Sequence, residues 1–435
     1  MTNLRFYSGL KEIGGTVVAV ETDKAICIFD FGYSNSDRID SKVSVRKGNE
    51  VLDYIKLGIL NSLDGVYEKN IADKLGKKAY GDTDKQVFVI ISHMHIDHMG
   101  GLGALAQELP VYMSSDSATL YHEMGIMGEL EYREHSNVIP VDYDASFTVE
   151  DIKVTCVQVD HDVIGACGFL IETKEGKICY TGDYRFHGYH PEISRGFAEK
   201  CKGADVMISE GVTISFADVD TLSLTEPERE SSEYTLLEKV ADYSANEEGL
   251  IVINNYNRNV ERVHHFCEII KKNGRTLVLD QIQAEYVAAF YEDDFSVYLP
   301  EGGTISAPRI KDHPVVTRKD LLENPKAYVL QQDYKDSYEL FDLAPVISKY
   351  LHMDGAPLGD YDPSFGIFYK MLDAIGINVE RCGLGGHAEP YYLRKTVDEI
   401  QPRILIPLHS FRPEQLKSEK AGKIILPEIG DVISL

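Results

Sequence analysis

Three histidines and an aspartate fall within six consecutive residues, His93-Met94-His95-Ile96-Asp97-His98. The segment directly follows the apolar run Val87–Ile91, which predicts a buried strand, and it precedes a glycine pair where a helix would begin. Ligand sites of α/β proteins form at the carboxyl ends of strands, where the next helix presents its positive end. If these were unrelated histidines on the surface, three of the chain's 14 histidines would fall within six residues by chance alone. The residue types and their spacing therefore predict a metal centre.

Four further candidate residues each stand just after an apolar run that predicts a strand. They are His161 after Ile152–Val159, Asp183 after Ile178–Thr181, Glu210 after Val206–Ile208 and His409 after Ile404–Ile406. Taken singly, each histidine is more often a structural residue at the rim of a fold than a ligand. The repeated placement at strand ends predicts that these residues form one site together with the six-residue segment.

Strand-like apolar runs alternate with helical patterns through most of the chain, which indicates a layered α/β fold. With 435 residues, the chain exceeds the size of a single hydrophobic core, so two domains are expected. Residues 212–383 contain their own strand–helix–strand unit, with the helix at Val260–Lys272. Residues 384–435 are too few to fold alone and are expected to rejoin residues 1–211. The middle segment is therefore predicted to be an insertion.

The charge balance argues against generic adhesion to nucleic acid or to anionic membranes. Asp and Glu number 70 against 44 Lys and Arg, a formal net charge of −26. Bound divalent cations can still attract a phosphodiester, because the field at the site matters more than the net charge. The start of the sequence lacks the pattern of a secretion signal, and no apolar run is long enough to span a bilayer, so a cytoplasmic protein without membrane contact is expected. The seven scattered cysteines predict buried free thiols.

The metal-ligand series resembles that of the metallo-β-lactamase superfamily. The resemblance rests on HMHIDH, on His161, on the segment YTGD that ends at Asp183, and on LHS, which contains His409. The segment FDFG with Asp30 is similar to the superfamily's first motif, an aspartate that usually supports the ligands by hydrogen bonds. This resemblance implies an α/β fold of the αββα sandwich type.

The resemblance extends to the β-CASP nucleases, and among them to the ribonuclease J group, in which a cap domain is inserted before the last part of the hydrolase domain. Glu210 in MISEG, His387 in GGHA and His409 in PLHS match the three additional motifs of that group. The implied organisation is a first part of the hydrolase domain at 1–211, an inserted α/β β-CASP-like cap at 212–383, and the last part of the hydrolase domain at 384–435.

The resemblance also implies a role for each candidate residue. One ion would be held by His93, His95 and His161, a second by Asp97, His98 and His409, and Asp183 would bridge the two. A hydroxide shared by both ions would be the nucleophile, with Asp97, Glu210 and His387 as the catalytic side chains. On chemical grounds, because the leaving oxygen needs a proton, His387 oriented by Glu210 is the pair expected to supply it. The alternatives are a backbone-capping role for His387 and a helix-start acid for Glu210. The imidazole-rich set favours zinc, and its carboxylates also accept manganese.

Two segments depart from the ribonuclease J pattern. The Ser/Gly-rich turn that binds phosphate in that group is replaced by YVLQQDYKDSYELFDL, and Ala388-Glu389-Pro390 follows His387 without a small hydroxyl residue. Little preference for a 5′ monophosphate is therefore expected. Three hypotheses remain: a phosphodiesterase acting on RNA, a hydrolase of a small ester, lactone or phosphodiester, and a non-catalytic subunit of an RNA-processing assembly. The third is weakest because all seven ligands are kept. A homo-oligomer is compatible with the sequence.

Overall fold

The computed structural model describes residues 1–34, 38, 43, 45–228, 231–359 and 362–435, and the sheets, helices and clusters discussed are those formed by these residues. The chain divides into two compact units. The first comprises Met1–Phe186, His190–Glu228 and Gly386–Leu435, and the second comprises His187–Tyr189 and Arg229–Gly385. Within the described ranges, no helix has both the length and the apolar character needed to cross a bilayer.

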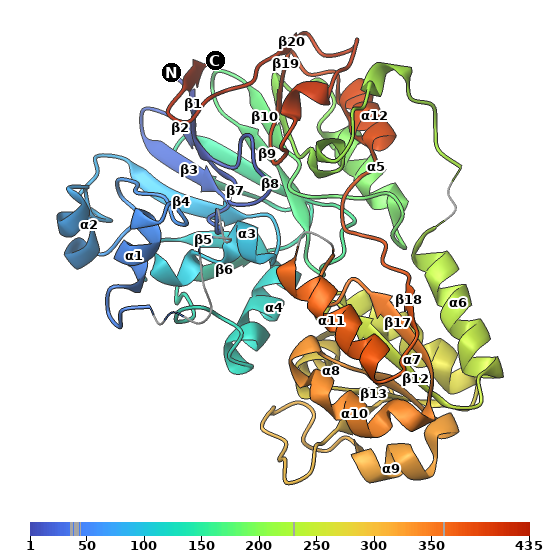
Figure 1. Cartoon of the computed structure of the whole chain (residues 1–435). Coiled ribbons are helices and arrows are strands. Elements are labelled where there is room, and N and C mark those ends of the chain that lie inside the picture. Colours follow the sequence, from blue (N-terminus) through green and yellow to red (C-terminus); the bar gives the residue numbers. More distant parts are fainter. Residues whose placement is uncertain (35–37, 39–42, 44, 229–230, 360–361) are drawn as a thin grey trace. The chain divides into compact units, whose positions relative to one another are not determined.

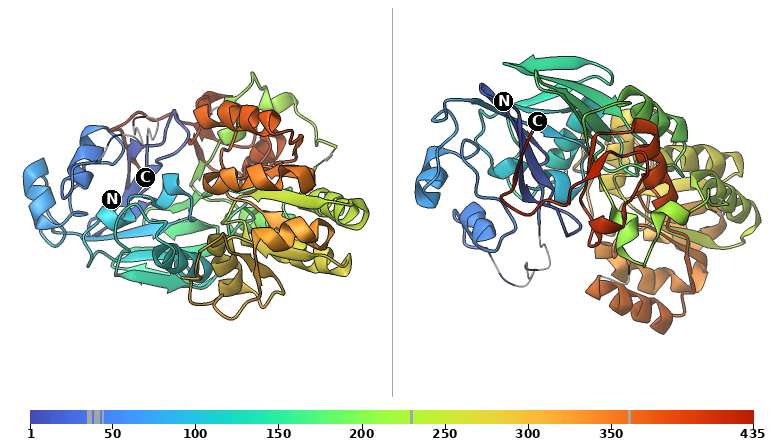
Figure 2. Two further views of the ribbon diagram at one scale, coloured as in Figure 1. Left: turned by 60° about the horizontal axis from the view of Figure 1, so that its bottom comes forward. Right: turned by 90° about the horizontal axis from the view of Figure 1, so that it is seen from above.

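The first unit is built on two seven-stranded sheets (Figure 1). The first sheet has the order β21-β1-β2-β3-β4-β5-β6, with strands β1 (Asn3–Ser8), β2 (Val17–Glu21), β3 (Ala25–Phe29), β4 (Gln86–Ile91), β5 (Val111–Ser114), β6 (Val138–Val141) and β21 (Val432–Ser434). The second has the order β20-β19-β11-β10-β9-β8-β7, with strands β7 (Ser146–Val149), β8 (Ile152–Gln158), β9 (Cys167–Glu172), β10 (Lys177–Tyr180), β11 (Val206–Ser209), β19 (Ile404–Pro407) and β20 (Lys423–Ile424). Strand β21 pairs with β1, which brings the two chain ends together in every view (Figures 1 and 2).

Alternating apolar side chains place the core of this unit between the two sheets. In β1, Leu4 and Phe6 are fully buried while their neighbours are partly exposed, and in β8 the same holds for Ile152 and Val154. These residues join one continuous apolar cluster to which both sheets contribute. This alternation, in which every second side chain of a strand is buried, is the pattern of a sheet that packs one face on another sheet.

Helices cover the outer faces, which completes an αββα sandwich. The helices α1 (Glu50–Lys56), α2 (Lys69–Leu75), α3 (Ile96–Met99) and α4 (Ser115–Ile126) belong to the chain that builds the first sheet. On the second sheet, α5 (Pro191–Lys200) packs against β8 and α12 (Pro390–Ile400) packs against β11. The five apolar runs predicted to be strands next to the candidate residues are confirmed within one residue at each end, as β4, β8, β10, β11 and β19.

The second unit contains a seven-stranded parallel sheet of order β15-β14-β13-β16-β12-β17-β18. Its strands are β12 (Leu250–Asn255), β13 (Thr276–Leu279), β14 (Ser296–Tyr298), β15 (Val315–Val316), β16 (Tyr328–Gln331), β17 (Ile347–Met353) and β18 (Val379–Arg381). Its helices are α6 (Glu233–Asn246), α7 (Val260–Lys272), α8 (Gln281–Phe290), α9 (Arg318–Glu323), α10 (Leu340–Leu343) and α11 (Pro363–Ala374). The predicted helix at Val260–Lys272 is confirmed. Its apolar face, with Val263, Phe266 and Ile270, is buried.

A buried carboxylate at the carboxyl end of β13 is expected to make the second unit less stable above pH 6. Asp280 caps α8, because its Oδ1 accepts hydrogen bonds from the backbone N–H groups of Ile282 (2.8 Å) and Gln283 (2.9 Å). Burial raises its pKa to about 6, and the charge of Asp333 acts in the same direction. The folded protein therefore binds this proton more tightly than the unfolded chain does. Its free energy of unfolding should fall as pH rises from about 4 to 6.

We expect Asp280→Asn to unfold with a free energy about 1–3 kcal/mol higher than the wild type at pH 7. Near pH 4 the two proteins should be similar, because asparagine is also a good N-cap and the wild-type carboxyl is then protonated. Urea unfolding at both pH values, followed by circular dichroism, measures the difference. An equal difference at the two pH values would contradict this role for Asp280.

Candidate metal centre

Five strands of the first unit bring the candidate residues to one place. Asp30 follows β3, His93 follows β4, His161 follows β8, Asp183 follows β10 and His409 follows β19. The remaining ligand candidates, His95, Asp97 and His98, lie at the start of α3, directly after β4. Residues that are far apart in the sequence meet here because several neighbouring strands end at the same edges of the two sheets.

The first group of candidate ligands consists of His93, His95, His161 and Asp183, whose nearest donor atoms all lie within 4.8 Å of one another. Nδ1 of His95 lies 3.3 Å from Nε2 of His161, and Nε2 of His93 lies 3.7 Å from Oδ2 of Asp183. Burial lowers the pKa of His93 well below its ordinary value and brings the pKa of His95 to about 3. Both rings are therefore neutral imidazoles, the form that binds a metal ion.

The second group consists of Asp97, His98 and His409, again within 4.8 Å of one another. Oδ2 of Asp97 lies 3.5 Å from Nε2 of His98 and 3.6 Å from Nε2 of His409. Asp183 reaches this group as well, because its Oδ2 lies 3.2 Å from Nε2 of His98 and 3.4 Å from Nε2 of His409. One oxygen atom of Asp183 thus lies beside ligands of both groups.

The donor set fits divalent metal ions. Nε2 of His93, His98 and His409 and Oδ2 of Asp183 are buried and make no hydrogen bond to any described residue. Each such unsatisfied atom costs about 1–3 kcal/mol unless a ligand compensates for it. Ligands bound at about 2.0–2.1 Å in tetrahedral geometry lie about 3.3–3.4 Å apart, and several of the spacings given above are close to this. Burial raises the pKa of Asp183, but His409 and His98 outweigh it and bring the pKa well below its usual range, so the carboxylate is ionised.

Hydrogen bonds behind the ligands hold the rings in place. Oδ2 of Asp30 accepts hydrogen bonds from Nδ1 of His98 (2.8 Å), from Oγ of Ser92 (2.9 Å) and from the hydroxyl of Tyr180. Nδ1 of His98 therefore carries the proton, which leaves Nε2 free to bind a metal. Asp30 and His409 both have left-handed backbone conformations, with φ of 59° and 53°. Such strain in residues other than glycine is often found at functional sites.

A third group joins Asp183 to Glu210 and His387. Nδ1 of His387 lies 3.5 Å from Oε2 of Glu210 and 3.7 Å from Oδ2 of Asp183. Glu210 is buried, and its Oε2 also accepts a hydrogen bond from the backbone N–H of Val212 at 3.0 Å. Burial would lower the pKa of His387, but Glu210 and Asp183 outweigh it and raise the pKa to about 9. The group therefore presents a protonated imidazole beside the two metal-ligand groups.

Several residues that shape the centre were not identified from the sequence. Ser92 and Tyr180 support Asp30, and Asp162 lies between two of the ligand histidines. Asp162 could have been found, since it is an acidic residue directly after His161 at a strand end. The sequence offers no comparable signal for Tyr180, whose role depends on the pairing of the two sheets.

The turn before His387 lies directly against the first ligand group. The carbonyl oxygen of Gly386 accepts a hydrogen bond from Nδ1 of His161 at 2.5 Å. A Cβ atom at Gly386 would lie 2.5 Å from Oδ1 of Asp162 and 2.6 Å from Cε1 of His161. Only glycine allows the backbone to approach these side chains so closely.

We expect Gly386→Ala to lower the free energy of unfolding by about 1–3 kcal/mol and to weaken metal binding, because His161 and Asp162 must move. The matched control is Gly196→Ala in α5, where a Cβ atom would meet nothing within 4 Å. That variant should gain about 0.5–1 kcal/mol, since alanine favours a helix over glycine. Calorimetry and chelator titration measure both quantities. Metal binding by Gly386→Ala equal to the wild type would show that the contact is not needed.

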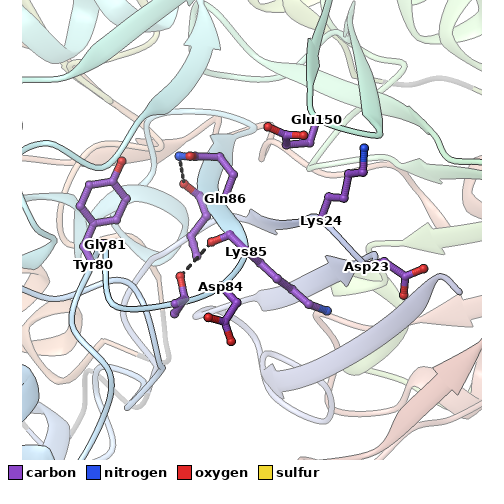
Figure 3. Close-up of a pocket in the computed structure, with 10 residues that line it drawn as sticks. Asp23, Lys24, Tyr80, Gly81, Asp84, Lys85, Gln86 and Glu150 are labelled. Atoms are coloured by element: carbon purple, nitrogen blue, oxygen red, sulfur yellow. Dashed lines mark hydrogen bonds between the residues drawn. The ribbon is translucent and has the colours of Figure 1, made fainter.

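A surface hollow of about 450 Å³ lies at the other end of the first sheet (Figure 3). Its lining includes Lys24 before β3, Lys85 before β4, and Glu150. Because β3 and β4 are parallel and the metal-ligand groups follow their carboxyl ends, this hollow is at the opposite edge. Lys85 is also paired with Glu21, at 2.7 Å. The hollow is therefore separate from the candidate centre.

Known proteins share both the sequence pattern and the fold. Residues 72–221 match the model of the beta-lactamase superfamily domain. Ribonuclease J of Pyrococcus abyssi is 27% identical over 64% of this chain and 58% of its own length. Ribonuclease J 1 of Streptococcus pyogenes is 21% identical over 81% of this chain and 65% of its own length. The chain thus spans less than two thirds of the length of these relatives.

A solved structure matches the whole chain. It is a protein of unknown function from Enterococcus faecalis V583, with a TM-score of 0.83, 29% sequence identity and full coverage of both chains. The matched domain, the relatives and the αββα fold together support a ribonuclease J-like metallo-hydrolase of the β-lactamase superfamily.

Proposed function

We propose that this protein is a metal-dependent hydrolase with a two-metal centre that cleaves phosphodiester bonds of RNA. The observation that carries the proposal is the meeting of seven ligand candidates in two groups that share Asp183. The ribonuclease J relatives support RNA as the substrate class. The insertion at 212–383 in the sequence, which overlaps the second compact unit, would be the β-CASP-like cap.

In this proposal His93, His95 and His161 would hold one ion, Asp97, His98 and His409 would hold the other, and Asp183 would be shared by both. When bound, the two ions would supply a water nucleophile at neutral pH and neutralise the charge that develops on the phosphate. Asp30, Ser92 and Tyr180 would keep the rings oriented, as partners behind ligands commonly do. Zinc is favoured by the imidazoles, and manganese is the alternative because carboxylates make up part of the set.

His387 is the proposed proton donor to the leaving oxygen, and Glu210 its positioning residue. Nδ1 of the ring, 3.5 Å from Glu210, is held protonated by the facing carboxylates. The side chain is 23% exposed while Glu210 is buried, so His387 is the member of the pair that substrate can reach. General acids contribute about 10²–10⁴-fold to such reactions.

A small ester, lactone or phosphodiester is the second candidate substrate. The formal net charge of −26 opposes a polyanion, and the segment after β16 lacks the hydroxyl-rich turn of a phosphate site. In that segment Oδ2 of Asp333 accepts a hydrogen bond from the side chain of Asn257 at 2.9 Å, so a carboxylate and amides take the place of hydroxyls.

The test is a panel of substrates given to protein loaded with zinc or with manganese: end-labelled single-stranded RNA, a chromogenic phosphodiester and a chromogenic ester. We expect RNA to be cut, chelator to stop the reaction, and 5′-monophosphate and 5′-hydroxyl RNA to react at similar rates. Asp183→Asn, purified in parallel, controls for contaminating nuclease. Intact RNA at low salt together with hydrolysis of the small phosphodiester would favour the second candidate. No hydrolysis of any substrate by fully loaded protein would favour a non-catalytic subunit.

A further inference from the structure

Asp162 is a buried carboxylate at the metal centre with no assigned role. Its residue is 9% exposed, and its Oδ1 makes no hydrogen bond to any described residue. That oxygen lies 3.4 Å from Nε2 of His95 and 3.4 Å from Nε2 of His161. A carboxylate oxygen therefore lies against two ligand rings.

The two nitrogens of His95 face different partners. Nδ1 lies 3.3 Å from Nε2 of His161, within the first ligand group, whereas Nε2 lies 3.4 Å from Asp162. A neutral imidazole that binds a metal through one nitrogen carries its proton on the other, and that proton needs an acceptor. For His95, binding through Nδ1 would put the proton on Nε2, the atom beside Asp162.

Three other ligand rings of the centre have such a partner on the side away from the ligand groups. Nδ1 of His98 pairs with Asp30, Nδ1 of His161 pairs with the carbonyl oxygen of Gly386, and Nδ1 of His93 lies 2.9 Å from Oγ of Ser92. In each of these rings Nε2 is left to face the ligand groups. His95 has the opposite orientation, so its acceptor has to lie on the Nε2 side, where Asp162 is found.

We infer that Asp162 is a positioning residue of the metal centre, whose carboxylate accepts the Nε2 proton of His95 and so presents Nδ1 of that ring to the metal. Gly386 lies against this carboxylate, since a Cβ atom there would stand 2.5 Å from Oδ1. The inference rests on the proposed two-metal centre but not on the substrate, since it concerns the binding of metal alone.

The experiment compares zinc affinity, by competition with a chromogenic chelator, for the wild type, Asp162→Asn and Asp162→Ala. Partners of this kind commonly contribute about 10–100-fold to metal affinity. We expect Asp162→Ala to bind the weaker-held zinc 10–100-fold less tightly. Asp162→Asn should lose less, because it keeps a neutral acceptor oxygen. The matched control is Asp151→Asn, which should bind zinc as the wild type does. Asp151 lies in the β7–β8 turn, where its carboxylate accepts a hydrogen bond from the side chain of Thr22.

Proton NMR of the cobalt(II)-loaded protein supplies a signature that general destabilisation would not produce. A metal-bound histidine gives a strongly shifted, solvent-exchangeable N–H signal from its other nitrogen. One such signal should exchange faster with water, or vanish, in Asp162→Ala and not in Asp151→Asn. Asp162→Asn has nearly the volume of the native residue, so the same two readouts decide the question if the alanine variant does not fold.

Wild-type affinity and an unchanged NMR signal in the Asp162 variants would overturn the inference. Complete loss of one ion in both variants, with a changed cobalt absorption spectrum, would also overturn it and make Asp162 a direct ligand. Cleavage of RNA enters neither readout. A protein that binds two ions but leaves RNA intact would therefore contradict the proposed function without affecting the role of Asp162.

Discussion

Asp183→Asn is expected to retain no more than one metal ion per chain, against two in the wild type, and to hydrolyse substrate about 10³-fold more slowly or worse. Oδ2 of Asp183 is the atom that lies beside ligands of both groups, 3.7 Å from His93 and 3.2 Å from His98. A neutral amide is a poor bridge between two cations. Losing one ion removes several kcal/mol of transition-state stabilisation, and each 1.36 kcal/mol is a factor of ten in rate.

Elemental analysis of protein purified without chelator, and again after incubation with zinc or manganese, measures the metal content beside the rate. Asp151→Asn serves as the control. Asp151 lies at the opposite edge of the sheets, where its carboxylate accepts a hydrogen bond from Thr22, just before β3. Two ions in Asp183→Asn would contradict the bridging role. A wild-type protein that never holds more than one ion would contradict the two-metal centre itself.

His387→Ala should lower the rate by about 10²–10⁴-fold while leaving the metal content at two ions per chain. The proposed role is to give a proton to the leaving oxygen, which the ions do not do. His387 is placed in neither of the two groups proposed to hold the ions, and it approaches them only through Asp183 at 3.7 Å. Single-turnover kinetics with metal analysis of the same sample separates the two effects. Loss of metal together with the rate would instead make His387 a ligand.

The pH profile of Glu210→Gln tests the pairing of this histidine. Burial lowers the pKa of His387, and the carboxylates of Glu210 and Asp183 together raise it to about 9. Without the charge of Glu210 the imidazolium should lose its proton at lower pH, so the alkaline limb of kcat/KM should move toward neutral pH. Bound cations lower the pKa in both proteins, so the measured quantity is the shift between them. An unchanged limb would separate Glu210 from the proton transfer.

The sequence by itself determined the strands and the candidate ligands. Apolar β-branched runs such as Val87–Ile91 and Ile404–Ile406 form strands because branched side chains pack well on the pleated, buried surface of a sheet and lose side-chain freedom in a helix. Each candidate ligand follows such a run, and a strand end is a defined position in space. The segment from His93 to His98 could also be predicted as a site from the sequence, because all of its side chains lie within one short loop and the start of one helix.

Only the tertiary structure decided which of these side chains meet and what stands behind them. Glu210 and His387 lie far apart in the sequence, and they come together because α12, which follows His387, packs against β11 and the turn at Gly386 returns to His161. The hydrogen bonds of Asp30 with Tyr180 and the approach of Asp162 to His95 likewise join separate strands. No local pattern encodes such contacts. A periodic sequence specifies which face of an element is buried, whereas the register and packing of the two sheets specify the neighbours that each side chain finds there.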